Sequence, residues 1–149
     1  MFAWKVVGAR YAVVVVHSLA NARAALATGG PVTLLSGEGA ALYAGCLWWQ
    51  MLLAAARDEF PQVATEDFLD CADGSGQALA AVRIGLRRLV LWPDAPGRTR
   101  VAAILAESGG ILLSNRPPAL DLAQLGAARR LHEWVRAGSR TDDSAAPLR

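Results

Sequence analysis

Two residues have side chains suited to nucleophilic catalysis, and each follows a short apolar run. Cys71 ends the run 68–71 just before a predicted helix, a position that lowers the pKa of a thiol. His17 follows the valine-rich run 11–16 and would act as its base. Such a pair would transfer acyl or sulfur groups, or hydrolyse them. The alternative is a buried, inert Cys71, because Asp70 and Cys71 point to opposite faces of a strand and one of them faces a helix layer.

Further polar side chains follow the ends of the predicted strands. In parallel α/β sheets, ligands bind outside the carboxyl ends of the strands, so a small-molecule pocket is expected at this rim. Helix capping and solvation alone also place polar residues there. The residues expected to bind a ligand are Ser18, Ser36, Glu38, Asp70, Asp73, Ser75, Asn115 and Arg116, and Asp94 and Ser114 share the rim.

Neither a metal nor a cofactor is expected at this rim. Its carboxylates are of the kind that binds Mg²⁺, but each has an ordinary role as a cap or turn residue. The segments 37–42 and 74–79 both begin Gly-x-Gly after a strand. Each has Leu where a dinucleotide-binding loop needs a third Gly or Ala, so that the helix can pack close. Tight turns explain these glycines equally well.

A strand, helix and strand between residues 67 and 93 indicate the fold class. The apolar run 68–71 precedes a Gly-rich turn, an Ala-rich helix over 75–84 and a second apolar run over 89–92. So short an alternation is typical of a βαβ unit with parallel strands. Further strands are predicted at 11–16, 32–35 and 111–113, and further helices at 19–27, 40–59, 98–107 and 121–137.

These elements predict a three-layer α/β fold with a doubly wound, five-stranded, mostly parallel sheet of the flavodoxin-like type. Right-handed crossovers and helices on both faces favour the strand order 2-1-3-4-5. In that order the first and third strands are neighbours, which would bring His17 near Cys71. We expect a single domain over 1–137 and a disordered tail over 138–149. Whether residues 1–10 include a strand stays open.

The predicted helix 40–59 is apolar nearly all round, unlike an ordinary surface helix with one wet face. Between residues 41 and 56 its one strongly polar residue is Gln50, and its aromatic residues include Trp48 and Trp49. Either the rest of the domain buries this helix, or its outer face meets a second copy of the chain. We expect a homodimer through this helix, with Trp48 and Trp49 at the interface, and core burial is the alternative.

Composition limits the classes of function. The 149 residues carry a net charge of +2, and the basic residues are scattered, so nucleic-acid binding is not expected. Two cysteines without a CxxC pair do not indicate a structural zinc site. The N-terminus does not read as a signal peptide, and no apolar run reaches the roughly 20 residues that span a bilayer. We therefore expect a cytoplasmic protein that does not bind membranes.

The last third of the chain contains a segment similar to a known family. Residues 107–125 read Glu-Ser-Gly-Gly-Ile-Leu-Leu-Ser-Asn-Arg-Pro-Pro-Ala-Leu-Asp-Leu-Ala-Gln-Leu, and with the following helix to 136 they resemble the fifth strand and final helix of response-regulator receiver domains. Arg116-Pro117 stands where that family has Lys-Pro, and Asp70 matches its phosphoacceptor. The chain departs from the family at His17-Ser18, in place of an acidic pair, and at Trp92-Pro93, in place of Ser or Thr. The resemblance implies a shared scaffold.

Three functions follow from these patterns. The first is a non-catalytic interaction or small-ligand-binding protein with a polar pocket at the carboxyl ends of the strands. The second is a small-molecule enzyme that uses Cys71. The third is a degenerate receiver-like signalling module with Asp70 at its centre.

Overall fold

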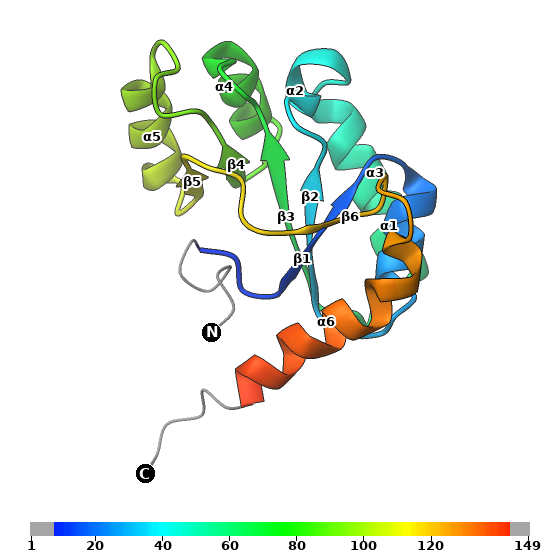
Figure 1. The fold of residues 1–149 in the computed structure, drawn as a ribbon. Helices are drawn as coiled ribbons and strands as arrows, with labels where there is room; N and C mark the ends of the chain where they lie inside the picture. Colours follow the sequence, from blue (N-terminus) through cyan, green and yellow to red (C-terminus); the bar gives the residue numbers. More distant parts are fainter. Residues whose placement is uncertain (1–7, 144–149) are drawn as a thin grey trace.

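The computed structural model describes residues 8–143, with side chains up to residue 139 (Figure 1). It contains a six-stranded, all-parallel sheet with helices packed on it, so the predicted α/β class is confirmed. The strands are β1 (Ala12–Val16), β2 (Val32–Ser36), β3 (Thr65–Asp70), β4 (Arg88–Val90), β5 (Ile111–Leu113) and β6 (Leu120–Asp121). The helices are α1 (Leu19–Leu26), α2 (Ala40–Tyr43), α3 (Cys46–Glu59), α4 (Ser75–Arg83), α5 (Arg98–Glu107) and α6 (Ala127–Asp143).

The strand order is β5-β4-β3-β2-β1-β6, so the predicted order 2-1-3-4-5 is wrong. β2 lies between β1 and β3, because Leu34 of β2 pairs with Val14 on one side and with Asp67 on the other. Each crossover as far as β5 moves one strand in the same direction, and the chain then returns across the sheet to place β6 beside β1 (Figure 1). Right-handed crossovers are compatible with both orders, so handedness alone does not choose between them.

Side chains of alternating strand positions form two apolar clusters, one on each face of the sheet. Val14, Leu34 and Leu69 belong to the first cluster, where α1, α3, α4 and α5 supply the covering side chains. The second cluster includes Val13, Val15, Leu35, Phe68 and Val90, with Ala9, Ala119 and Trp134 packed against them. Trp134 of α6 also donates its indole N–H to the carbonyl of Val13 at 2.8 Å. The second face therefore has no full helix layer: Trp134 packs against it, whereas Ala127, Leu131 and Val135 of the same helix α6 pack into the first cluster.

The predicted helix 40–59 is two helices, α2 and α3, separated at Gly45, whose φ of +89° an L side chain rarely adopts. Trp49 is 0% exposed and belongs to the first cluster, so its predicted place at an interface is wrong. Trp48 is partly buried against the same cluster. Leu47 and Met51, four residues apart on α3, are the exposed apolar side chains of this helix instead.

α6 differs from its prediction at both ends. It begins at Ala127 instead of residue 121, and it continues to Asp143, so residues 138–143 are helical and not a tail. Gly138 allows α6 to pack closely on β1, because a Cβ there would lie 2.6 Å from the Cβ of Ala12. The rest of the predicted tail, 144–149, lies outside the described residues, as do residues 1–7.

Candidate functional site

The carboxyl ends of β2 and β3 are joined by hydrogen bonds around Asp70, which is 0% exposed. One carboxylate oxygen accepts the backbone N–H groups of Gly39 at 3.1 Å and Ala72 at 2.8 Å. The other accepts Nη1 of Arg116 at 2.7 Å. Ser36 completes this Asp70 network, since its hydroxyl accepts the Asp70 N–H at 2.9 Å and its carbonyl accepts Nη1 of Arg116 at 3.0 Å. Protein donors therefore occupy both carboxylate oxygens, and Asp70 has no surface for a ligand.

The resemblance to receiver domains is met at one point. Arg116, which stands in the lysine position of that family, donates a hydrogen bond to Asp70, the residue that matches its phosphoacceptor. The strand order is not the doubly wound order expected for that scaffold. The Asp70 carboxylate has no exposed surface.

Cys71 lies on the helix-covered face of the sheet and is 0% exposed. Burial raises the pKa of the Cys71 thiol from 9.0 to about 12, and the Asp70 carboxylate and Cys46 add to the increase. The thiol donates a weak hydrogen bond to the carbonyl of Leu69 at 3.8 Å. β2 separates β1 from β3, so the strand adjacency that was expected to bring His17 near Cys71 is wrong. A buried thiol whose pKa is raised is the arrangement expected of core packing.

His17 is paired with Asp121, a residue that the sequence did not single out. His17 Nε2 lies 2.7 Å from Asp121 Oδ1, which also accepts the N–H of Ala123 at 2.9 Å. Burial alone would raise the pKa of Asp121, but the hydrogen bonds from Ala123 and His17, and the charges of His17 and Arg116, lower it overall. Both side chains of the pair are about one-third exposed, at 36% and 32%. The pair ties the end of β1 to β6.

The sequence did not predict Asp121 as a site residue, because residue 121 was assigned to the start of the last helix. The signal that could have found it is Pro117-Pro118, which favours extended chain just before β6. The sequence also did not predict that Tyr43, which it placed inside a helix, lies near His17. Its hydroxyl and the His17 imidazole both lie against Gly37.

The remaining rim residues have separate local surroundings. Ser18, which was expected to bind a ligand, is the N-cap of α1 and accepts the Asn21 N–H at 3.1 Å. Ser114 accepts Nη2 of Arg98 at 2.8 Å, and Ser75 has a buried hydroxyl without a partner at the start of α4. The exposed members of the set are Glu38, Asp73, Asp94 and Asn115.

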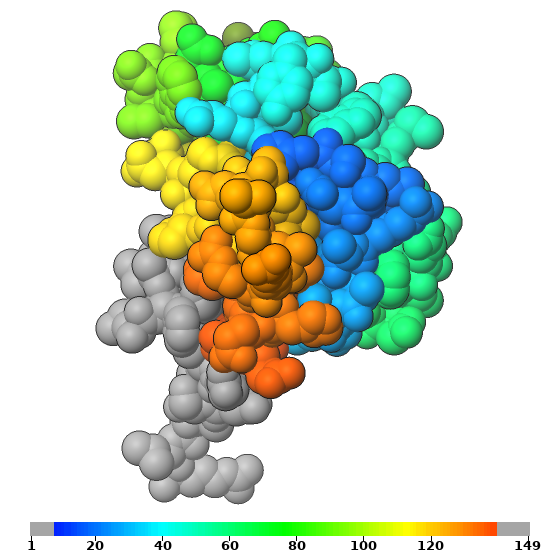
Figure 2. Space-filling view, turned by 45° about the vertical axis from the view of Figure 1, so that its right-hand side comes forward, coloured from blue at the N-terminus to red at the C-terminus, as the bar shows by residue number. Residues whose placement is uncertain are grey.

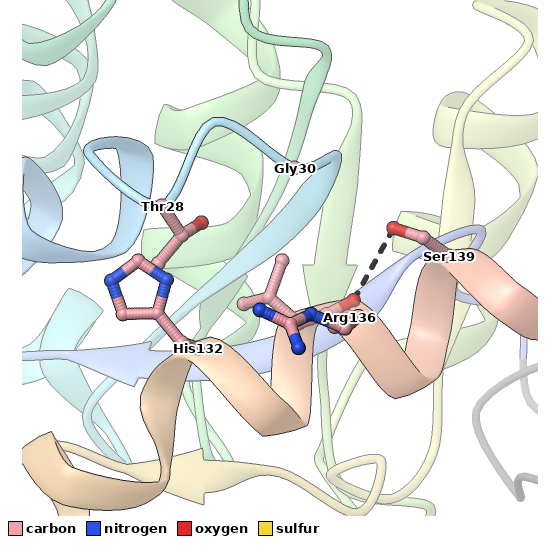
Figure 3. A pocket seen from close by; sticks show the side chains of 6 residues that line it. Thr28, Gly30, His132, Arg136 and Ser139 are labelled. Carbon is pink, nitrogen blue, oxygen red and sulfur yellow. Dashed lines mark hydrogen bonds between the residues drawn. The ribbon is translucent and has the colours of Figure 1, made fainter.

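Three hollows lined by described residues lie away from this rim. The first holds about 170 Å³ between the α1–β2 turn and α6, and Figure 3 shows its side chains. Its two hydroxyl groups, of Thr28 and Ser139, donate to backbone carbonyls and are not free to donate to a ligand. The second, of about 220 Å³, is mainly apolar and lies beside Trp134.

The third hollow, of about 390 Å³, lies at the amino ends of β3 and β4, and we call it the Arg57 hollow. It opens between α3, β3 and the turn that joins α4 to β4. Its lining mixes charged, amide and apolar groups, in contrast to the second hollow. The residues that line it are Gln50, Leu53, Ala54, Arg57, Asp67, Gly85, Leu86, Arg87 and Arg88.

Large apolar side chains are exposed on α2 and the first turns of α3. Leu42, Tyr43, Leu47 and Met51 are 46%, 69%, 57% and 65% exposed, and we call these four the α2–α3 patch. No charged residue occurs between residues 39 and 56. In Figure 2 this segment, coloured cyan to blue-green, lies uncovered along the upper surface of the molecule.

The described residues contain no group of three or more His, Cys, Asp or Glu that could hold a metal ion. Among the helices of residues 8–143, none is long and apolar enough to cross a membrane. A comparison with models of known families found no match, and a comparison with curated proteins found none either. The side chains and their surroundings are therefore the basis on which function is inferred.

Proposed function

We propose that this protein is a non-catalytic interaction domain that forms a homodimer through the α2–α3 patch. The observation that carries the proposal is the exposure of four large apolar side chains on a segment without charge. In a monomer these side chains leave apolar surface in contact with water, which is unfavourable. Association of two copies would bury that surface. The proposed interface thus lies on the segment 40–59 that the sequence predicted, but Leu47 and Met51 contribute to it instead of Trp49.

A second copy of the chain suits this surface better than a charged partner. A twofold dimer places the same patch on both sides of the interface. Because residues 39–56 carry no charge, two copies meet without like-charge repulsion and without burying an unpaired charge. A partner with a charged docking surface would find no complementary group on the patch.

The chemistry at the sheet edge supports an interaction role over an enzyme. The Asp70 carboxylate and the Cys71 thiol are the groups there that are best suited to catalysis, and both are buried. Asp70 accepts three hydrogen bonds from the protein, and the pKa of Cys71 is far above neutral pH. Both groups serve the scaffold that holds α2 and α3 in place.

Sedimentation equilibrium of the purified chain tests the proposal. The wild type is expected to dimerise, and Leu47→Glu is expected to weaken the dimer at least about tenfold, because the interface would bury a carboxylate without a partner. Leu125→Glu is the matched control, since Leu125 is a fully exposed leucine outside the patch. It should leave the dimer unchanged.

Two outcomes would overturn the proposal. A wild-type chain that stays monomeric up to its solubility limit would exclude self-association. A dimer that Leu47→Glu and Met51→Glu leave at wild-type strength would exclude the patch as its interface. Circular dichroism of each variant shows that a change in association does not come from unfolding.

A further inference from the structure

The Arg57 hollow contains two arginines whose side chains are held in place by the protein. Nε of Arg57 donates to Thr65 Oγ1 at 2.8 Å, and its Nη2 donates to Asp67 Oδ1 at 2.8 Å. On the other side of the hollow, Nη1 of Arg87 donates to the carbonyls of Val82 at 2.9 Å and Leu86 at 3.0 Å. These bonds restrict both guanidinium groups before any ligand binds, which lowers the entropy cost of binding.

Both guanidinium groups keep N–H donors without a partner among the described residues. Nη1 of Arg57 makes no hydrogen bond, and neither do Nε and Nη2 of Arg87. Gln50 uses its amide nitrogen on the carbonyl of Ile84 at 2.6 Å, which leaves its amide oxygen free. The hollow thus presents mainly donors.

The charges around the hollow are unbalanced in favour of an anion. Arg57 is paired with Asp67, whereas Arg87 contacts only neutral carbonyls. The remaining arginine in the lining, Arg88, lies 3.5 Å from the buried carboxylate of Glu66. One positive charge, that of Arg87, therefore has no carboxylate partner in the described part of the chain.

We propose that the Arg57 hollow binds the carboxylate or phosphate group of a small molecule, with Arg57 and Arg87 as its donors. Planar guanidinium groups match the geometry of both oxyanions. A volume of about 390 Å³ is in the range of small-molecule sites. The hollow lies at the amino ends of the strands and shares α3 with the α2–α3 patch, since Ala54 lies one helical turn from Met51. The inference rests on the two arginines and does not require the proposed dimer.

Calorimetric titration with inorganic phosphate and, separately, with succinate tests the site. Ala54 lines the hollow from α3 and is exposed, so it can be replaced without removing a hydrogen bond. Ala54→Glu places a carboxylate beside the arginines and is expected to weaken anion binding at least about tenfold. Ala54→Lys, with the opposite charge at the same position, is expected to keep or strengthen it.

Ala128→Glu, on the exposed surface of α6, controls for the change in net charge. Binding of either probe that falls in Ala54→Glu and in Arg87→Gln but not in Ala128→Glu supports the site. The probe that binds identifies which oxyanion the site takes. Neither probe binding the wild type, or an equal loss in Ala54→Glu and Ala128→Glu, overturns it. Thermal unfolding without ligand confirms that each variant is folded.

Discussion

Asp67 and Asp70 of β3 each pair with an arginine, and the two pairs differ in their surroundings. One pair lies towards the amino ends of the strands and the other at their carboxyl ends. Arg116 meets Asp70 at 2.7 Å at the carboxyl edge, where Asp70 is 0% exposed and accepts two further backbone N–H groups. Arg57 meets Asp67 at 2.8 Å near the amino edge, where the Arg57 side chain is 40% exposed. The first pair is closed within the protein, and the second opens onto a hollow.

The difference shows that an arginine–aspartate ion pair does not by itself indicate a ligand site. A buried carboxylate must be compensated by donors, and at Asp70 the compensation is complete, so nothing remains for a ligand. At the Arg57 hollow, solvent reaches the guanidinium groups and their spare donors stay available. At the carboxyl ends of the strands, where parallel sheets usually bind ligands, the Asp70 network is therefore closed, whereas the Arg57 hollow at the amino ends is open.

The largest effect is expected from Asp70→Ala, which should lower the free energy of unfolding by about 3–5 kcal/mol. The change leaves Arg116 without its partner and removes the acceptor of the Gly39 and Ala72 N–H groups. Urea denaturation measures the loss. Asp73→Ala, at an exposed aspartate three residues away, should cost less than about 0.5 kcal/mol. Equal losses in the two variants would contradict a closed network.

A smaller loss, of about 1–2 kcal/mol, is expected from Asp67→Ala. Arg57 loses a hydrogen bond, but its partly exposed guanidinium regains water and keeps its bond to Thr65. The same urea titration compares this variant with Asp70→Ala, and Asp58→Ala, exposed on α3, is the control. If Asp67→Ala costs as much as Asp70→Ala, the two pairs are equally closed and the contrast between the edges fails.

At alkaline pH, the raised pKa of Cys71 predicts a loss of stability. The folded protein keeps the thiol proton up to a pKa of about 12, whereas the unfolded chain releases it above 9.0. Stability from this group is therefore complete below pH 9.0 and decreases as the pH rises towards 12, by up to about 1.4 kcal/mol per pH unit. Urea titrations at several pH values measure the slope.

The Cys71→Ala variant should lack this alkaline slope, whereas Cys46→Ala should keep it.

Alkylation offers a second measurement at the same end of the strands. In the native protein near neutral pH, Cys71 should resist labelling until the chain unfolds, because it is both buried and protonated. Fast labelling of native Cys71 would show that the carboxyl edge is open after all.

The smallest effect is expected at His17 and Asp121, which form a pair at the same edge but outside the Asp70 network. Asp121→Asn should cost at most about 1 kcal/mol, because both side chains are partly exposed to solvent. The lowered pKa of Asp121 means that its contribution is present above its ordinary pKa of 3.8 and is lost as the pH falls below it. Urea denaturation at neutral and acid pH tests both statements, and a loss as large as that of Asp70→Ala would extend the closed network to β6.

The elements that follow local rules were predicted well. The helix 98–107 and the strand 111–113 have the predicted bounds, and Ser18 caps α1 as expected. Each depends on local signals such as a glycine stop, a short apolar run or a capping hydroxyl. The prediction that Asp70 and Cys71 face opposite sides of the sheet is also confirmed, because alternation along a strand is a local property.

The predictions that failed depended on neighbours distant in sequence. The strand order decides that His17 meets Asp121 and not Cys71. Gly138 reads as a helix stop until its close approach to Ala12 is known. Trp49 reads as an interface residue until the sheet is seen to cover it.

By itself, the sequence determined the class of the fold, the positions of most elements and the apolar character of residues 40–56. These properties follow from periodicity, caps and turns, which act over a few residues. Only the tertiary structure decided which polar groups are sealed and which remain open. Exposure depends on what packs against a side chain from elsewhere in the chain, and Arg116 reaches Asp70 across 46 residues of sequence.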